Sequence, residues 1–407
     1  MTRRRRRPNY FGLMILGLVL TFGYYLNQVY LPSQPNPFEA TPTPTRPPES
    51  YVSEAQALFD AGKLFQAIEA YQQAISISPQ DSTLYVALAR VQVFAGQYEE
   101  AQKNAENALL LNPNNALAHA VRAWALNFQD KNAEAQASIQ EALRLDPNNA
   151  LAHAYYVEIL IDSGFDSFAK AAEESRVALA LDPNLLEVRR ARALILEVTA
   201  NYEEAIAQYQ AAIEINKNIP ILHFELGRTY RRLEAYDKAI EEFTVANTLN
   251  PSDPRPDLAI SRTYATIGQY EKALQYAETA LKDNPGDAAL RGNLGVMYYR
   301  NLLWPEAVEQ LRLTIYGGKT EEGVEVTGIP LVNDVFVAEY YYTYGLALAR
   351  TNQCGEALQI AQMLQTKVPS DENAVFAASE IIRICEERLN SPVVNTPTPT
   401  LDITPTP

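Results

Sequence analysis

Residues 220–253 read PILHFELGRTYRRLEAYDKAIEEFTVANTLNPSD, and this segment decides the fold. Ala239 and Ala246 stand seven residues apart. That spacing is two turns of an α-helix, so both side chains lie on one face. Alanine at these positions lets a neighbouring helix approach closely, and Phe243 lies between them. Pro251 cannot continue the helix. The segment is therefore predicted to be a helical hairpin whose second helix packs through its alanines.

The same pattern recurs along the chain with a period of 34 residues. The closing prolines are Pro79, Pro113, Pro147, Pro183, Pro251, Pro285 and Pro369, with Lys217 at the one missing position. The two small-residue positions hold Ala67, Ala101, Ala135, Ala171, Ala205, Ala239, Ala273, Ala307 and Ala357, then Ala74, Ala108, Ala142, Ala178, Ala212, Ala246 and Ala280. Glycines expected to end the first helix of a hairpin are Gly62, Gly96, Gly164, Gly268 and Gly355.

Nearly all of residues 48–369 resemble the tetratricopeptide repeat (TPR) family. Its first-helix pattern is clearest in Leu226-Gly227 before Tyr230 and in Leu294-Gly295 before Tyr298. The resemblance implies an all-α fold, a right-handed superhelical solenoid of about nine helical hairpins over residues 48–390. We expect repeats to start near residues 48, 82, 116, 150, 186, 220, 254, 288 and 338, with two extra residues around Phe165–Phe168. A capping helix at about 372–389 should cover the last apolar face.

Two features depart from the regular pattern. His119, His153 and His223 occupy one structural position of the repeat, and we interpret them as packing residues rather than as a metal or catalytic cluster. Residues 316–337 do not fit a repeat; their alternating, glycine-bracketed pattern predicts a short hairpin or an extended arm. This insertion is either a docking arm over the binding groove or a patch at the joint to repeat nine.

The family binds ligands on the concave face formed by the first helices. Projecting its inward positions onto this sequence gives a candidate ligand groove of Arg90, Trp124, Tyr155, Glu158, Arg190, Phe224, Arg228, Arg231, Arg262, Tyr299 and Tyr342. Arginine and aromatic residues are typical of binding hot spots. The family's clamp for C-terminal carboxylates is absent, because Arg190, Leu194, Phe224 and Arg228 stand at its positions. The alternative is that these arginines only pair with Glu187, Glu197 and Glu225.

The N-terminus has the pattern of a membrane anchor. Residues 10–31 are apolar and long enough to cross a bilayer, and tyrosines stand at both ends. The basic residues Arg3–Arg7 precede them, so residues 1–9 should stay cytoplasmic and the rest should lie outside the cell membrane. A cleaved signal peptide is the competing interpretation. Proline-rich segments follow at 32–47, read as a spacer, and at 391–407, read as a disordered tail.

Composition excludes several classes of function. The chain of 407 residues has a net charge of −15, and residues 32–407 carry more negative charge still, which argues against nucleic acid as a partner. With two cysteines, three histidines and no phosphate-binding loop, we expect no enzyme, no metal, no cofactor and no small-molecule substrate. Cys354 and Cys385 are 31 residues apart, about one repeat, and are predicted to form a disulfide; two free thiols are the alternative.

The leading hypothesis is a single-pass, bacterial cell-envelope protein whose solenoid, outside the membrane, binds a protein or peptide as a scaffold. One alternative is a cytosol-facing receptor on an organelle for chaperones or precursor proteins. Another is recognition of a glycan or cell-wall polymer by the aromatic residues of the concave face.

Overall fold

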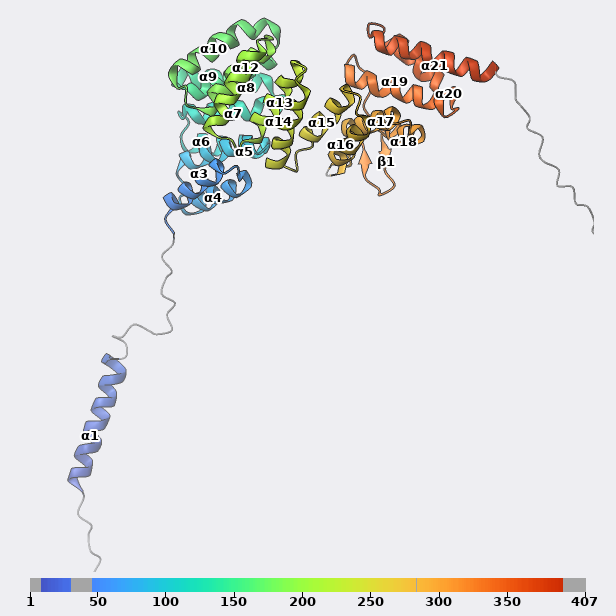
Figure 1. Cartoon of the computed structure of the whole chain (residues 1–407). Helices are drawn as coiled ribbons and strands as arrows, with labels where there is room; N and C mark the ends of the chain where they lie inside the picture. Colours follow the sequence, from blue (N-terminus) through green and yellow to red (C-terminus); the bar gives the residue numbers. More distant parts are fainter. Residues whose placement is uncertain (1–8, 31–45, 283, 391–407) are drawn as a thin grey trace, which may run out of the picture.

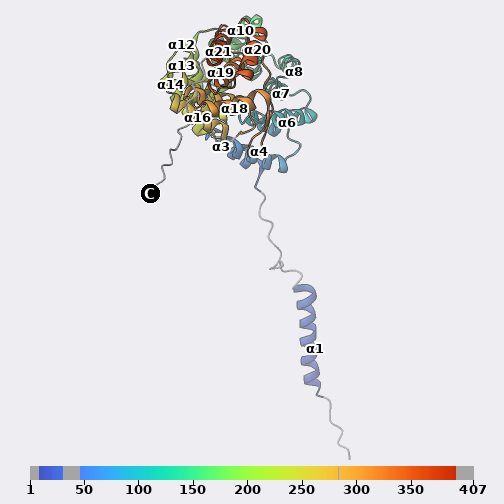
Figure 2. The ribbon, with the colours of Figure 1, turned by 90° about the vertical axis from the view of Figure 1, so that its right-hand side faces the viewer.

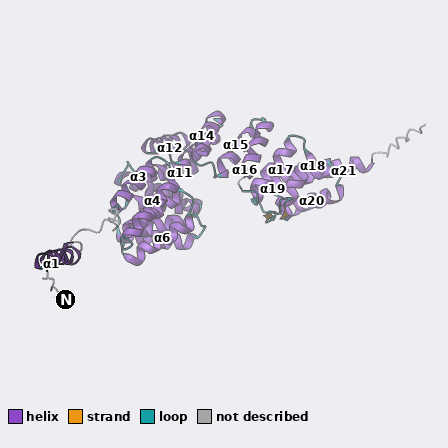
Figure 3. Ribbon diagram, turned by 90° about the horizontal axis from the view of Figure 1, so that it is seen from below, coloured by secondary structure: helices purple, strands orange, loops and turns teal. Residues whose placement is uncertain are grey.

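The computed structural model describes residues 9–30, 46–282 and 284–390, and almost all of them are helical (Figures 1 and 3). Nine helical hairpins, called repeats one to nine below, follow one another. They are α3 (Pro48–Asp60) with α4 (Leu64–Ile77), α5 (Ser82–Phe94) with α6 (Tyr98–Leu111), α7 (Ala116–Asn127) with α8 (Asn132–Leu145), α9 (Ala150–Asp162) with α10 (Phe168–Leu181), α11 (Leu186–Val198) with α12 (Tyr202–Ile215), α13 (Pro220–Arg232) with α14 (Tyr236–Leu249), α15 (Pro254–Thr266) with α16 (Tyr270–Lys282), α17 (Ala288–Arg300) with α18 (Trp304–Tyr316), and α19 (Val335–Arg350) with α20 (Cys354–Lys367). The all-α solenoid predicted from the sequence is thus confirmed.

Alanine sets the packing of each hairpin. The alanines predicted at the two small positions are buried, and most have no exposed surface, as at Ala101, Ala135 and Ala239. Helix α21 (Glu372–Asn390) follows the last hairpin as the predicted cap. In repeat four the two extra residues form a 3₁₀ turn, η2 (Phe165–Ser167), between its helices.

The turn inside most hairpins needs one residue in the left-handed region. Glycine fills it at Gly62, Gly96 and Gly268, where φ is +73°, +77° and +77°. Other repeats place non-glycine residues there, namely Asp130, Ala200, Glu234, Leu302 and Asn352. The prediction for Gly355 was wrong. Asn352 makes that turn, and Gly355 is the second residue of α20.

The first six repeats wind far enough to bring repeat one against the joint between repeats five and six. Asn218 Nδ2 donates to the carbonyl of Asp60 at 2.8 Å, and Asn216 Nδ2 donates to that of Phe59 at 3.4 Å. A Cβ on Gly62 would lie 2.5 Å from the carbonyl oxygen of Asn218, so glycine permits this approach. An apolar cluster joins Phe59 and Leu64 to Ile219 and Leu222. We call repeats one to six, residues 48–249, the closed turn.

Repeats seven to nine and α21 continue away from the closed turn (Figure 1). In the view turned by 90°, α19–α21 overlap the earlier helices, so the solenoid runs in one general direction (Figure 2). Its second half has a core of its own, in which Tyr344, Leu311 and Ile381 are fully buried. The solenoid therefore has a closed first part and an open second part.

The insertion before repeat nine is a short antiparallel hairpin, β1 (Gly318–Lys319) with β2 (Glu325–Val326), as predicted. Val326 and Leu331 are buried. The backbone of Ile329 donates to the carbonyl of Thr314 and accepts a bond from the hydroxyl of Tyr341. These contacts favour the patch over the free docking arm. The insertion is shorter than the predicted segment 316–337, because α18 extends to Tyr316 and α19 begins at Val335.

Two further features lie at the ends of the described chain. Helix α1 (Tyr10–Tyr25) continues as a π-helical segment, η1 (Leu26–Tyr30), and none of its side chains is buried by the described residues. The 20 residues Tyr10–Val29 are long and apolar enough to span a membrane. Cys354 and Cys385 form a disulfide with their Cα atoms 5.5 Å apart, which ties α20 to the cap. The basic block, the 32–45 part of the spacer and the 391–407 tail lie outside the described residues.

Candidate functional site

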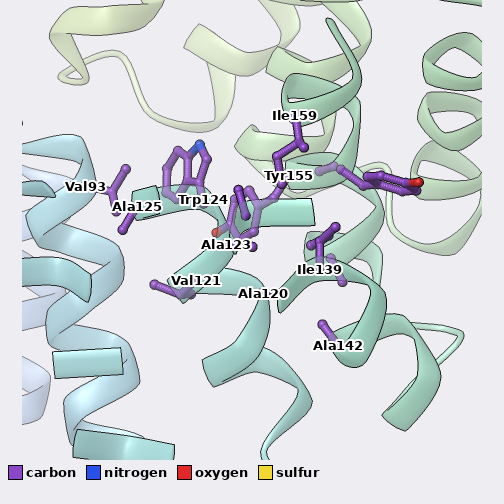
Figure 4. Packing of buried hydrophobic residues seen from close by; sticks show 14 of the residues in the cluster. Val93, Ala120, Val121, Ala123, Trp124, Ala125, Ile139, Ala142, Tyr155 and Ile159 are labelled. Carbon is purple, nitrogen blue, oxygen red and sulfur yellow. The ribbon is translucent and has the colours of Figure 1, made fainter. Parts of the chain in front are cut away.

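The structure buries the centre of the predicted groove. Trp124 on α7, Tyr155 on α9 and Arg190 on α11 are 1%, 0% and 3% exposed. The rings of Trp124 and Tyr155 stack with centroids 4.3 Å apart (Figure 4). Closure of the first turn makes its concave face an interior, so the prediction that Tyr155 contacts a ligand was wrong, while Trp124 and Arg190 keep only a small exposed edge on the wall of a hollow described below. Their large side chains fill that interior.

Carboxylates pair with the arginines of the closed turn. Arg190 bonds Glu158 at 2.5 Å and Glu225 at 2.6 Å. Arg90 pairs with Glu187, which lies 97 residues along the chain, and Arg228 with Glu197 at 2.9 Å. Burial alone would lower the pKa of Arg190, but Glu158 and Glu225 raise it, so the guanidinium stays charged. The alternative interpretation, in which the inward arginines pair with carboxylates of the protein instead of a ligand, therefore holds for Arg90, Arg190 and Arg228.

The remaining predicted groove residues lie beyond this network. Phe224 is half-buried, with the guanidinium of Arg255 5.4 Å from its ring centre. Tyr299 and Tyr342 are half-buried on α17 and α19. Burial raises the pKa of the Tyr342 hydroxyl, and the negative charge of Glu339 raises it further.

Arg231 and Arg262 line an open hollow in the second half of the solenoid. We call it the arginine cavity; it measures about 560 Å³. Its lining residues are Arg231, Tyr236, Arg262, Ala265, Thr266, Tyr270, Asn293, Met297, Arg300, Phe336 and Glu339. Helices α13, α15, α17 and α19 supply most of them, because each presents its inward face to the same hollow.

The positive charges of the arginine cavity are poorly neutralised. Arg300 reaches Glu339 only at 3.7 Å. Arg262 bonds the neutral Tyr340 hydroxyl at 3.1 Å and lies 3.8 Å from the ring centre of Phe336. In the described part of the chain neither Arg231 nor Arg262 forms an ion pair with a carboxylate. Burial, followed by repulsion from Arg262 and its neighbours, lowers the pKa of Arg231. An anionic group would relieve this repulsion.

Sequence reasoning missed a second hollow, at one end of the closed turn. We call it the aromatic cavity; it measures about 440 Å³. It is lined by Phe65, Val93, Phe94, Ala95, Gly96, Tyr98, Trp124, Phe128, Arg190, Ile221, Asn250, Ser252, Asp253, Pro254 and Arg255. Tyr98 and Phe128 flank the turns of consecutive repeats, a signal visible in the sequence. The loop 250–255 reaches the cavity only because the chain winds back.

The three histidines share one role, as predicted. His119, His153 and His223 each bond the backbone carbonyl six residues earlier, at 3.1, 2.9 and 2.9 Å. Tyr85, Arg189 and Arg291 make the same bond at the equivalent positions of other repeats. The position therefore ties each first helix to the loop before it. Within the described residues, no cluster of three or more His, Cys, Asp or Glu side chains could hold a metal ion.

Comparison with protein families agrees with this repeat architecture. Tetratricopeptide repeat models match residues 58–125, 116–149, 201–234, 222–253 and 258–319, together more than half of the chain. The chain belongs to the tetratricopeptide repeat family. TPR proteins generally bind other proteins, so the fold is consistent with an interaction scaffold. A comparison with curated proteins found no match.

Solved structures share the TPR fold at low identity. The complex described as "APC/C hetero-tetramer Cut9-Hcn1" is 13% identical with a TM-score of 0.60, over 90% of this chain and 82% of that one. A TPR protein from Parabacteroides merdae is 16% identical with a TM-score of 0.42, over 61% and 98%. At these identities the likeness concerns the fold alone.

Proposed function

We propose that this TPR protein is a membrane-anchored scaffold that binds an acidic segment of a partner protein in the arginine cavity. The observation that carries the proposal is that, among the described residues, Arg231 and Arg262 form no ion pair with a carboxylate, and the single carboxylate lining the cavity, Glu339, faces three arginines in a chain whose net charge is −15. Elsewhere in the solenoid, carboxylates of the protein itself neutralise the inward arginines. Tyr236, Tyr270 and Phe336 add aromatic surface beside the charges, a composition typical of binding hot spots.

The test is binding of a fluorescein-labelled peptide containing several glutamates to the full chain in detergent, followed by anisotropy. Replacing Arg231→Gln and Arg262→Gln together should weaken binding by about tenfold or more, because each charge-assisted hydrogen bond contributes on the order of 1.5–3 kcal/mol. The matched control is Arg176→Gln with Arg383→Gln. It makes the same change of net charge on exposed residues of α10 and α21. Equal weakening by both pairs would contradict a local site.

We further propose that α1 is an uncleaved anchor and that the solenoid lies outside the cytoplasm. The length and apolar character of Tyr10–Val29 support an anchor. The bond between Cys354 and Cys385 supports an oxidising compartment over the cytosol-facing alternative. Protease added to intact cells should digest the solenoid, and thiol labelling of the unfolded, non-reduced protein should find no free cysteine. A mature N-terminus within residues 25–50 would show instead that α1 is a cleaved signal.

A further inference from the structure

The aromatic cavity has the size of a small-molecule site. Its volume of about 440 Å³ falls within the range of roughly 300–1,000 Å³ found for ligand pockets. A second hollow of about 310 Å³ adjoins it and shares Phe65, Ala95 and Asn250. The aromatic cavity can hold an aromatic ring with a substituent.

Aromatic rings form much of the cavity wall. Tyr98 and Phe128 stack with centroids 4.7 Å apart and planes at 6°. Phe94 meets Trp124 edge to face at 5.1 Å. These walls present both ring faces and ring edges, and aromatic groups prefer stacked or edge-to-face neighbours over other arrangements. An aromatic ligand would extend interactions that the wall already makes.

The charges beside the cavity are already paired. Arg190 is held by Glu158 and Glu225, and Arg255 bonds Asp253 at 2.7 Å. The indole N–H of Trp124 donates to Glu158 at 3.1 Å, so it offers nothing to a ligand. A charged ligand would lose hydration without gaining a partner. The wall therefore favours an uncharged molecule. Ser252 donates its hydroxyl to Asn250 Oδ1 at 2.9 Å, so a polar substituent would bond the amide N–H groups of Asn250 or donate to the Ser252 oxygen.

The cavity exists only because the turn is closed. Phe65 comes from repeat one, Trp124 from repeat three, and Ser252 from the loop between repeats six and seven. Trp124, Tyr155 and Arg190 fill the interior beyond it, which leaves no path for an extended polypeptide through the turn. We propose that the aromatic cavity binds a small, uncharged aromatic molecule, a function independent of the arginine cavity.

The experiment uses Trp124 as the reporter. The chain has two tryptophans, so Trp304→Phe leaves Trp124 as the single emitter. The probe is 4-nitrobenzyl alcohol, an uncharged quencher, added to the full-length Trp304→Phe protein in detergent. Because Trp124 is 1% exposed, collisional quenching should be weak, and binding in the cavity should give saturable quenching.

Filling the cavity should abolish that saturation. Ala95→Phe places a ring into the space, and the dissociation constant should rise by about tenfold or more. Thr199→Phe is the matched control, since it changes the equivalent, exposed position in the turn of repeat five, away from the cavity and from the contact that closes the turn. Should Ala95→Phe fail to fold by circular dichroism, Ser252→Phe fills the cavity from the opposite wall.

Two results would overturn the proposal. One is linear, non-saturating quenching of equal slope in the parent and both variants. The other is a saturable shift of the Trp124 emission maximum with the peptide Gly-Phe-Gly and no saturable quenching by 4-nitrobenzyl alcohol, which would mean that the cavity receives a side chain of a partner protein. Because no variant in this experiment touches Arg231 or Arg262, a failure here leaves the acidic-peptide test standing.

Discussion

At the residue scale, the solenoid depends on positions that accept no extra atom. A Cβ added to Gly295 on α17 would lie 2.5 Å from Cγ of Leu311 on α18, and one on Gly345 would lie 2.5 Å from Cδ1 of Ile381. The glycines let paired helices approach as closely as the buried alanines do elsewhere. Gly355, by contrast, has no atom within 4 Å of such a Cβ and a φ outside the left-handed region.

Gly295→Ala should therefore destabilise the protein, and Gly355→Ala should not. Overpacking a well-filled core costs about 1–3 kcal/mol. Alanine near the start of α20 is neutral or slightly stabilising, because it restricts the unfolded chain. Urea unfolding followed by circular dichroism measures both. A Gly295→Ala protein as stable as its parent would mean that α17 and α18 are less closely packed than their contact suggests.

At the element scale, the position shared by the histidines carries a titratable bond. His153 Nδ1 lies 2.6 Å from Glu174, and His223 Nδ1 lies 2.7 Å from Glu242. Burial alone would lower the pKa of both histidines, but the bonds to these carboxylates and to the preceding loop carbonyls raise it above 6.5. His119 Nδ1 has no partner in the described residues.

Because of these bonds, we expect the folding stability to decrease as the pH rises. A raised folded-state pKa means that the stabilisation is fully present below pH 6.5, the ordinary value, and is lost as pH rises through the folded-state pKa. The thermal midpoint should therefore decline above about pH 6.5. Glu174→Gln with Glu242→Gln should flatten that decline and lower the midpoint mainly at acidic pH. An unchanged profile in the double variant would assign the dependence to other groups.

The repeated elements could be predicted because their signals are local. A 34-residue period, paired alanines and a closing proline each follow from helix geometry within one hairpin. The turn at Asn352 was missed because glycine is only the commonest residue for left-handed backbone, not a requirement. The turn was assigned to Gly355 instead, because this glycine lies close to Asn352 in the sequence.

At the scale of the whole molecule, the closed turn decides which concave residues are accessible. Closure depends on small rotations accumulated over six repeats, and no single repeat encodes it. The contact from Asn218 to Asp60 spans 158 residues, beyond the range of any periodic signal. Trp124 and Tyr155 were therefore assigned correctly to the inward face, but closure leaves Tyr155 no exposed surface for a ligand and limits Trp124 to the wall of the aromatic cavity. Arg231, in the last repeat of the closed turn, and Arg262, in the next repeat, line a hollow that the closure leaves open.

Gly62→Ala should open the turn. A methyl group there would lie 2.5 Å from the carbonyl of Asn218. The substitution also places alanine in left-handed backbone, so Gly268→Ala is the control, because Gly268 has a φ of +77°, close to the +73° of Gly62, and an added Cβ would have no atom within 4 Å. Hydrogen exchange should become faster in residues 48–77 for Gly62→Ala but not for Gly268→Ala. Equal protection in the two variants would mean that the contact does not hold repeat one.

The hairpin that closes the turn is also the part of the solenoid nearest in sequence to α1. If α1 is held in a bilayer, tension on the partner enters the folded chain at Pro48 and reaches the Asn218 contact before any later repeat. The contact of repeat one with the loop between repeats five and six would then be the first contact to bear the force. Under force this contact would break first while the later hairpins stay folded, and it would form again when the force is removed.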